Sequence, residues 1–281
     1  ESLSIREGSV VVDGTLGGGG HTMAIAERVG ATGLVISLDR DVSAIDRFEE
    51  RRGDLPIRLA HANFTHIPEV LDQLDIDRVD AVVLDLGLSS DQLADDERGF
   101  SFHSHGPLDL RFDTSEGEPA WRLLNRLSRD HIADLLFTFG EERLSRKIAA
   151  RIVRQRGEQP LQRAIDLAAL ITDVYPSFRR EKIHPATRSF QALRIAVNEE
   201  LQSLEIALRR IPERIRTGGR FCVISFHSLE DRRAKHSFRD DARLLLPAGH
   251  SITAGEEEVN RNPRSRSARL RTAERSPFEE E

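Results

Sequence analysis

Four consecutive glycines between an apolar run and a histidine form the stretch of this chain best suited to hold a ligand. Residues 10–22 read VVVDGTLGGGGHT, so a predicted strand leads directly into the glycines. A glycine turn after the first strand of an α/β sheet lets a ligand lie against backbone N–H groups. The nicotinamide dinucleotide pattern G-x-G-x-x-G fails, because its third glycine would fall on Met23 or Thr22. A tight turn without a ligand is the alternative for these glycines.

Two acidic residues at the ends of later apolar runs supply further chemistry. Asp39 ends the second run, where a carboxylate can accept hydrogen bonds from the ribose hydroxyls of NAD or of S-adenosylmethionine. Asp85 ends the run VVLD and can accept a hydrogen bond from an amine of a cofactor or of a substrate. Helix capping is the alternative for Asp85, and His21 is equally consistent with an ordinary residue of a first helical turn.

The elements that must position these residues alternate in type along the first part of the chain. Short β-rich runs are separated by segments with helical periodicity. Because the runs are apolar on both faces, they predict a parallel sheet covered by helices on both sides. We expect strands at residues 9–13, 34–39, 57–62 and 80–88, and helices at residues 21–29, 43–52 and 66–74.

The alternating pattern stops near residue 119. From there to about residue 206 the sequence shows only helical periodicity, and after a predicted turn at residues 217–219 the run RFCVISF predicts another buried strand. We therefore predict an α/β sheet that is interrupted by an inserted all-helical domain. The predicted segments are the core at residues 1–108 and 207–281, the insertion at residues 109–206, and an edge strand or hairpin within residues 262–275.

Composition restricts the partners and the chemistry of the chain. Its 281 residues carry a formal charge of −6, so a polyanion would have to be bound by local clusters of cations. The only cysteine, Cys222, excludes an internal disulfide and a zinc site built from several cysteines. The sequence has no apolar stretch of membrane-spanning length and no signal peptide. We expect a cytoplasmic protein without a metal site or a membrane partner.

Eight sequence blocks are more specific as an ordered set than singly. They are VDGTLGGGGH, LDLGLSSDQL, RGFSF, GPLDLRFD, GEERLSRKIAARIV, HPATRSFQALRIAVNEEL, GGRFCVISFHSLEDR and NPRSRSARLR. Together they resemble the bacterial small-subunit ribosomal RNA cytosine-N4 methyltransferase family over nearly the whole chain. The resemblance implies a Rossmann-like class I methyltransferase sheet with a helical insertion and S-adenosylmethionine as the methyl donor. It also implies methylation of a decoding-region cytosine in 16S ribosomal RNA or in the small ribosomal subunit.

The resemblance assigns residues to the methyl donor. Phe64 would stack on or pack against adenine, Asp39 would bind the ribose, and the glycine turn would admit the methionine end of the donor. A phenylalanine of the hydrophobic core is the alternative for Phe64. The residues that match the donor-binding positions of the family are Gly19, Gly20, His21, Asp39, Phe64, Asp85 and Gln92.

Methylation of the exocyclic amine of cytosine fits these residues better than methylation of ring carbon C5. Attack at C5 normally uses a cysteine thiolate, and Cys222 lies within a predicted strand. An amine needs only in-line placement and acceptors for its hydrogens, which Asp85 and Ser89 can supply. A zinc deaminase lacks support because the sequence has no P-C-x-x-C. The catalytic residues that we predict are Asp85, Ser89 and His227, the last just beyond the final buried strand.

Cationic residues recur at helical spacing in RLSRKIAARIVRQR, with apolar residues on another face. The solvated face of an ordinary amphipathic helix is the alternative to RNA binding. Further basic residues lie within residues 179–188 and 261–271, and the scarcity of aromatic residues favours phosphate contact over base stacking. Helix packing or capping explains single residues of HPATRSFQALR, and of SFHSLEDR with His227, equally well. The substrate-binding residues that we predict are Arg143, Lys147, Arg151, His184, Arg188, Gln191 and Arg194.

Two other functions fit parts of the sequence. A methyltransferase of the same fold with a small molecule or a protein as acceptor would keep the donor site. A non-catalytic RNA-binding factor of the same fold would not bind the donor at all. The sequence leaves open whether the chain is a monomer or a homodimer.

Overall fold

The computed structural model describes residues 2–176 and 183–277, and the chain divides into two compact units. The first unit comprises Glu1–Gly87 and Leu201–Glu281, and the second comprises Leu88–Glu200. The second unit begins and ends earlier in the chain than the predicted insertion, residues 109–206. This is because Phe100 packs in the hydrophobic core of the helical unit, whereas Leu204 packs in the core of the sheet unit.

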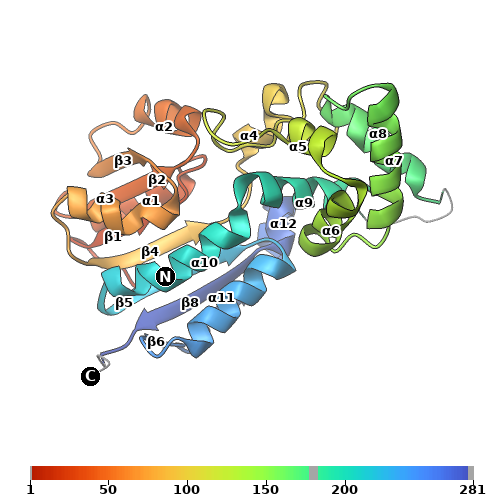
Figure 1. Cartoon of the computed structure of the whole chain (residues 1–281). Coiled ribbons are helices and arrows are strands. Elements are labelled where there is room, and N and C mark those ends of the chain that lie inside the picture. Colours follow the sequence, from red (N-terminus) through yellow and green to blue (C-terminus); the bar gives the residue numbers. More distant parts are fainter. Residues whose placement is uncertain (1, 177–182, 278–281) are drawn as a thin grey trace. The chain divides into compact units, whose positions relative to one another are not determined.

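The first unit is built on one eight-stranded sheet (Figure 1). Its strands are β1 (Val10–Asp13), β2 (Leu34–Asp39), β3 (Ile57–His61), β4 (Val79–Asp85), β5 (Ile215–Ser225), β6 (Leu244–Leu245), β7 (Ser251–Thr253) and β8 (Arg269–Arg275). The strand order is β3-β2-β1-β4-β5-β8-β6, and β7 also pairs with β8. The first five strands pair in parallel, and β8 pairs antiparallel with its neighbours. The predicted Rossmann-like α/β fold is confirmed.

Helices cover both faces of this sheet. They are α1 (Gly20–Val29), α2 (Val42–Glu49), α3 (Ile67–Gln73), α10 (Glu200–Arg210) and α11 (Ser228–Asp240), with α12 (Glu256–Arg261) and the 3-10 helices η1 (Phe64–His66), η3 (Ile211–Arg214) and η4 (Pro263–Ser267) elsewhere in the unit. Val11 and Val12 are both fully buried but belong to different hydrophobic clusters. Val11 packs with residues of α1 and α2, and Val12 packs with residues of α3, α10 and α11. Burial on both faces explains why the central strand β1 has consecutive apolar residues.

Two features of β5 and β8 differ from the sequence-based expectation. The turn predicted at residues 217–219 lies inside β5, where the pairing with β4 shifts register between Val79 and Ala81. Gly218 has a φ of 78°, so the glycines form a bulge in the strand and not a turn before it. The strand expected at an edge within residues 262–275 is β8, which pairs with β5 on one side and with β6 and β7 on the other.

The second unit is helical. Its helices are α4 (Ser90–Ala94), η2 (Asp96–Arg98), α5 (Ala120–Arg126), α6 (Arg129–Gly140), α7 (Ser145–Glu158), α8 (Ala164–Val174) and α9 (Thr187–Asn198). Leu124, Ile132, Ile148 and Leu193 are fully buried in its core. In the described ranges of the chain, no helix combines the length and the apolar character that crossing a membrane requires.

Candidate functional site

Three carboxylates lie at the carboxyl ends of neighbouring parallel strands. Asp13 ends β1, Asp39 ends β2 and Asp85 ends β4. Because β1 lies between β2 and β4, the direction in which the chain adds strands reverses at β1. Ligands of open α/β sheets bind beyond the carboxyl ends of the strands at this reversal. The sheet thus brings residues from three separate sequence segments to one candidate site.

The glycine turn between β1 and α1 combines positions that require glycine with positions that leave open space. Gly19 has a φ of 78°, and a Cβ on it would lie 2.3 Å from the ring of Phe48. A Cβ on Gly18 or on Gly20 would meet no atom within 4 Å. Gly19 is therefore required by packing and backbone conformation, whereas Gly18 and Gly20 border space that a ligand can fill.

Asp39 fastens the glycine turn to the end of β2. Its Oδ2 accepts a hydrogen bond from the N–H of Gly17 at 2.8 Å, and its Oδ1 accepts one from the N–H of Asp41 at 2.8 Å. Burial raises the pKa of the Asp39 carboxyl above its ordinary value. Each carboxylate oxygen has a second lone pair, so Asp39 can still accept hydrogen bonds from a ribose.

Asp13 is a buried member of this site that the sequence analysis missed. Thr22 Oγ1 donates to Asp13 Oδ2 at 2.7 Å, and the N–H of Thr15 donates to Asp13 Oδ1 at 3.1 Å. Burial raises the pKa of Asp13 to about 6. Thr15 Oγ1 in turn accepts a hydrogen bond from the N–H of Asp85 at 2.6 Å. The two threonines that follow Asp13 in the glycine motif were the available sequence signal. Thr15 links the turn to the end of β4, and Thr22 Oγ1 lies 2.8 Å from Ser37 Oγ in β2.

His21 and Asp85 face each other across the site. His21 Nε2 lies 3.4 Å from Asp85 Oδ2, and the two side chains are 51% and 32% exposed. The hydrogen bond to Asp85 raises the pKa of His21 above its ordinary value. Asp85 Oδ1 is buried and has no hydrogen-bond partner among the described residues. An unsatisfied buried carboxylate oxygen is costly, so this atom marks the place where a ligand N–H or a cation can bind.

Phe64 lies at the same end of the sheet. It begins the 3-10 helix η1 and is partly buried against the hydrophobic cluster that includes Leu84. A Cβ on Gly14 would lie 3.1 Å from the Cβ of Phe64 and 2.4 Å from the Leu84 side chain. Gly14, the first residue after β1, has no side chain, and its backbone can therefore pack closely against Phe64. Core packing and contact with a ligand remain compatible for this ring.

Ser89 and Gln92 form a reciprocal capping box at the start of α4 in the second unit. Ser89 Oγ accepts a hydrogen bond from the N–H of Gln92 at 3.1 Å, and Gln92 Oε1 accepts one from the N–H of Ser89 at 3.1 Å. The pattern S-x-x-Q is a recognisable capping signal that the sequence analysis did not use. Catalytic and donor-binding roles for these two residues stay predictions.

His227 lies two residues after the end of β5, at the N-cap of α11. Its side chain is 11% exposed, and its Nε2 lies 3.1 Å from Oε1 of the buried Glu230. Glu230 Oε2 accepts a hydrogen bond from the N–H of Phe226 at 2.9 Å. The carboxylate of Glu230 thus holds the strand-to-helix junction and neighbours the imidazole, a structural role that the sequence analysis considered as capping. A catalytic role for His227 stays a prediction.

The predicted cationic face lies mostly on α7, but Arg143 precedes this helix, which begins at Ser145. Ile148 and Ile152 are buried in the core of the second unit, whereas Arg143 and Lys147 are exposed and Arg151 is half-buried. No acidic partner of these three cations lies among residues 2–176 and 183–277. Unpaired cations beside one another favour binding of a polyanion. Contact with RNA stays a prediction.

The predicted substrate residues of HPATRSFQALR are largely engaged within the second unit. The ring of His184 stacks on Phe102 with centroids 4.2 Å apart and planes 3° apart. Gln191 Nε2 donates to the carbonyl of Phe139 at 3.4 Å, and Arg188 is half-buried. The scarcity of aromatic residues favours phosphate contact over stacking, and the aromatic pair leaves no local sequence signal because its members are far apart in the chain.

Several other predicted cations are paired with acids. Arg194 makes a bidentate ion pair with Glu200 at 2.7 and 2.8 Å, with both side chains largely buried. In the tail, Arg271 is buried in β8 and makes a bidentate pair with Asp231 at 2.6 and 3.0 Å. The basic tail is therefore less available to a polyanion than its composition indicated. The basic residues Arg179, Arg180 and Lys182 lie outside the described residues.

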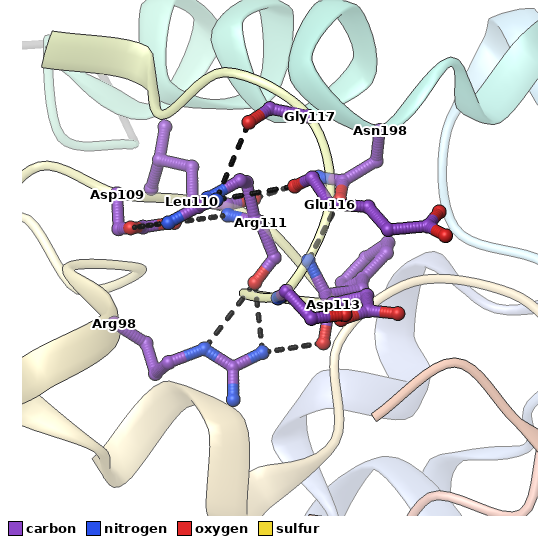
Figure 2. Close-up of polar contacts among 10 residues, drawn as sticks. Arg98, Asp109, Leu110, Arg111, Asp113, Glu116, Gly117 and Asn198 are labelled. Carbon is purple, nitrogen blue, oxygen red and sulfur yellow. Dashed lines mark hydrogen bonds and ion pairs between the residues drawn. The ribbon is translucent and has the colours of Figure 1, made fainter. Parts of the chain in front are cut away.

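A second polar network, also missed by the sequence analysis, holds the loop between η2 and α5 (Figure 2). Arg98 donates to the carbonyls of Arg111 and Phe112 at 2.7 and 2.6 Å. Asn198 Oδ1 accepts from the N–H of Phe112 at 2.7 Å, and Asn198 Nδ2 donates to the carbonyl of Leu110 at 2.7 Å. These bonds support Leu110 at a φ of 65°, a conformation that is costly for a leucine.

The same loop is closed by Arg111. Its guanidinium makes a bidentate pair with Asp109 at 2.8 and 2.7 Å and donates to the carbonyls of Glu116 and Gly117 at 3.1 and 3.3 Å (Figure 2). The acid and the base of the block GPLDLRFD thus satisfy each other and the backbone. This arrangement makes the loop a rigid element of the second unit.

Comparison with known proteins identifies the family of the chain. A family model described as the MraW methylase family matches residues 1–276. Ribosomal RNA small subunit methyltransferase H of Trichlorobacter lovleyi is 45% identical to this chain and covers 98% of it and 95% of its own length. The chain belongs to the MraW methylase family. Proteins of the same name from Pelobacter propionicus and Thioalkalivibrio sulfidiphilus are 46% and 47% identical, covering 97% and 98% of this chain and 94% of each relative.

As a member of the MraW methylase family, the chain is a methyltransferase, and its methyl donor is S-adenosylmethionine. Among solved structures, a putative rRNA-methylase from Clostridium thermocellum aligns with 96% of this chain and 90% of its own, with a TM-score of 0.46 and 14% identity. That likeness is too distant to bear on function.

The end of the sheet fits the methyl donor in space and in charge. Gly18 and Gly20 border open space, and Asp39 has acceptor capacity beyond the bonds it makes. The buried Oδ1 of Asp85 requires a donor or a cation, and the methyl donor carries both an ammonium and a sulfonium. Three carboxylates at one edge also match the net positive charge of such a ligand.

Proposed function

We propose that this methyltransferase transfers the methyl group of S-adenosylmethionine to the exocyclic N4 amine of a cytosine in the RNA of the small ribosomal subunit. Relatives that share about half of its residues over nearly the full chain are named for small-subunit ribosomal RNA. The observation that carries the choice of an amine is the buried thiol of Cys222, the only cysteine of the sequence. Methylation of a ring carbon of cytosine needs an accessible thiolate, whereas methylation of its amine needs none.

In this proposal the donor binds at the edge formed by β1, β2 and β4. The glycine turn admits the methionine end beside His21, Asp39 accepts hydrogen bonds from the ribose, and Phe64 contacts the adenine. Donor binding by Gln92 and catalytic roles for Ser89 and His227 belong to the same proposal. When bound, S-adenosylmethionine supplies the electrophilic methyl group, and the protein positions the amine and accepts its hydrogen bonds.

Cys222 argues against methylation at C5. The thiol is 1% exposed in the middle of β5, and burial raises its pKa to about 11. C5 chemistry needs a thiolate that attacks the pyrimidine ring, and a buried thiol with a raised pKa is a poor source of one. Methyl transfer to the amine needs no covalent bond to the protein, so it is compatible with this inert cysteine.

Cations on α7 and just before it, which have no acidic partner among the described residues, support RNA as the acceptor. Arg143, Lys147 and Arg151 would contact phosphates, and such contacts carry affinity but little sequence information. Selection of one cytosine then depends on RNA shape and on residues near the acceptor, for which we propose His184, Arg188, Gln191 and Arg194. A ribosomal substrate places the enzyme in the cytoplasm. A homodimer stays a prediction.

Methyl transfer to three acceptors tests the proposal. The protein is incubated with labelled S-adenosylmethionine and either small ribosomal subunits, naked 16S ribosomal RNA or cytidine, and the RNA is digested to nucleosides for mass spectrometry. We expect N4-methylcytidine from subunits or from their RNA, and none from cytidine. Formation of 5-methylcytidine, or transfer only to a small molecule or a protein, would overturn the proposal. Absence of donor binding in calorimetry would instead favour a non-catalytic RNA-binding factor.

A further inference from the structure

Asp85 is the acid at the centre of the proposed site, and its carboxylate already has a neighbour that can carry a positive charge, the imidazole of His21 at 3.4 Å. We propose that His21 is the counter-cation of Asp85 when the site is empty and that it gives up its proton when the methyl donor binds. His21 thereby makes the site distinguish the positively charged donor from its product. This inference rests on the proposed function, because it takes S-adenosylmethionine as the ligand of this site.

The two oxygens of the Asp85 carboxylate have different surroundings, one beside His21 and one without a partner among the described residues. His21 Nε2 lies 3.4 Å from Asp85 Oδ2, while Asp85 Oδ1 is buried and unpartnered within the described chain. The His21 side chain is about half exposed, so the imidazole can exchange its proton with solvent. Asp85 is held in place at its backbone, because its N–H donates a hydrogen bond to the side-chain oxygen Oγ1 of Thr15. A ligand that pairs with Asp85 therefore changes the charge that His21 faces.

The titratable groups that act on His21 come from two strands. Asp85 at the end of β4 contributes most, and Asp13 at the end of β1 adds a smaller attraction, so that together they raise the pKa of His21. Burial of the imidazole opposes this effect. Arg51 also contacts the glycine turn: its guanidinium donates to the carbonyl of Gly18 and lies over the ring of Phe48. The charge of His21 therefore depends mainly on Asp85 remaining free of another cation.

The donor and the product differ in one charge. S-adenosylmethionine has a sulfonium, an ammonium and a carboxylate, whereas S-adenosylhomocysteine has a neutral thioether in place of the sulfonium. A bound cation near Asp85 lowers the pKa of His21 and expels its proton, so the affinity for that ligand rises with pH. For one released proton the rise is at most about tenfold per pH unit, and it ends above the pKa of His21 in the free protein. The product, with less positive charge, should show a smaller rise.

Calorimetry of the full chain measures this proton directly. S-adenosylmethionine and S-adenosylhomocysteine are titrated into the protein in phosphate and in Tris, whose ionisation enthalpies differ, at several pH values between about pH 7 and 8.5. This range lies above the pKa of about 6 of Asp13, so that Asp13 contributes little to the linkage. The pH titration of the His21 imidazole, followed by NMR with and without each ligand, assigns the proton to this residue.

The variants are H21Q and a matched control, H236Q. His236 is exposed on α11 and belongs to no part of the proposed site. We expect the wild-type protein and H236Q to release a fraction of a proton on binding the donor, with a smaller release for the product. We expect H21Q to bind both ligands with a flat pH dependence, so that the ratio of the two affinities no longer changes with pH.

Each outcome separates the inference from the function on which it rests. Donor binding without proton release in the wild-type protein, or undiminished release in H21Q, would overturn the role of His21 and leave the methyl-donor site intact. An unchanged NMR titration of His21 in the presence of the donor would do the same. Failure of the wild-type protein to bind either ligand at any pH would instead contradict the proposed function.

Discussion

Two regions of this protein, the end of the parallel sheet and the loop between η2 and α5, differ in whether their polar groups are satisfied within the described chain. At the end of the parallel sheet, Asp85 keeps a buried oxygen without a partner, and Asp39 keeps acceptor capacity. In the loop between η2 and α5, Arg111 and Asn198 direct their polar groups to backbone atoms and to Asp109 (Figure 2). The contrast indicates that chemistry belongs to the first region and rigidity to the second, because unsatisfied polar groups are retained where a ligand completes them.

The same contrast applies to cations. Arg143 and Lys147 are exposed without a partner in the described part of the chain, whereas Arg194 and Arg271 are fixed by Glu200 and Asp231. A basic residue that is already paired must lose one partner to gain another, so it contributes little to polyanion binding. Charge counted along the sequence therefore overestimates the surface that can attract RNA.

The largest expected effect follows from removing the charge of Asp85. The substitution D85N keeps the side-chain size and the backbone bond to Thr15, and we expect methyl transfer to fall by about 10³-fold because the acceptor and its charge are lost. Asp80, at the start of the same strand, is the matched control, since it accepts a bond from the N–H of Val10. D80N should lower stability but leave turnover close to normal. Initial rates near wild type for D85N would remove Asp85 from the mechanism.

The closed network of the second unit predicts a loss of stability without a loss of donor binding. N198A removes bonds to Phe112 and Leu110, and we expect the free energy of unfolding of this unit to fall by about 2–4 kcal/mol. Hydrogen exchange should accelerate in residues 107–118 and stay unchanged in the glycine turn. E116A is the control, because Glu116 contributes only its carbonyl to the network. Equal protection of the loop in N198A and E116A would show that Asn198 does not hold it.

A pH effect on stability should come from the first unit. The pKa of Asp13 is raised from 3.8 to about 6, so between these values the folded state binds more protons than the unfolded state. The free energy of unfolding should therefore decrease as pH rises through this window, by on the order of 3 kcal/mol from this group alone. Urea unfolding of the wild-type protein and of D13N across about pH 4 to 7 isolates the contribution. If the free energy of unfolding of D13N falls with pH as steeply as that of the wild-type protein, Asp13 is not the group responsible for the pH dependence.

The smallest effect concerns the exposed cations Arg143, just before α7, and Lys147, in its first turn. We expect the double substitution R143Q/K147Q to weaken RNA binding about tenfold near physiological salt. The slope of the logarithm of the binding constant against the logarithm of the salt concentration should become shallower by about 0.7 for each lost charge. R163Q is the control, because Arg163 is exposed in the same unit but paired with Asp166 at 2.8 Å. Filter binding at several salt concentrations provides both slopes. If the control and the double variant lose affinity equally, pairing does not decide which cations bind RNA.

The core of the sheet was the most predictable part of the structure. The strand expected at residues 34–39 is β2 at the same residues, and the helices expected at residues 21–29 and 66–74 match α1 and α3 within one residue at each end. Such agreement arises because strands buried on both faces and short amphipathic helices leave a local pattern in the sequence. The bulge in β5 was mistaken for a turn, because two glycines look alike in both settings until the neighbouring strand sets the register.

The candidate site was only partly predictable. Asp39 and Asp85 were expected because each ends an apolar run, and the strand order brings both ends to one edge. Asp13 was overlooked although it ends the first run, because its burial and its bonds to Thr15 and Thr22 depend on the path of the turn. The pairing of Arg271 with Asp231 and the stack of His184 on Phe102 join residues with no local relation in the sequence.

The amino-acid sequence by itself determined the alternation of strands and helices, the glycine turn and the position of acids at strand ends. These are local properties, since burial period, turn chemistry and chain length act over a few residues. Tertiary structure alone decided which polar groups satisfy one another and which stay available. For example, Asp85 keeps an oxygen without a partner among the described residues, whereas the guanidinium of Arg194 is paired with Glu200. The reason is that pairing and burial depend on distances between residues that the chain brings together only on folding.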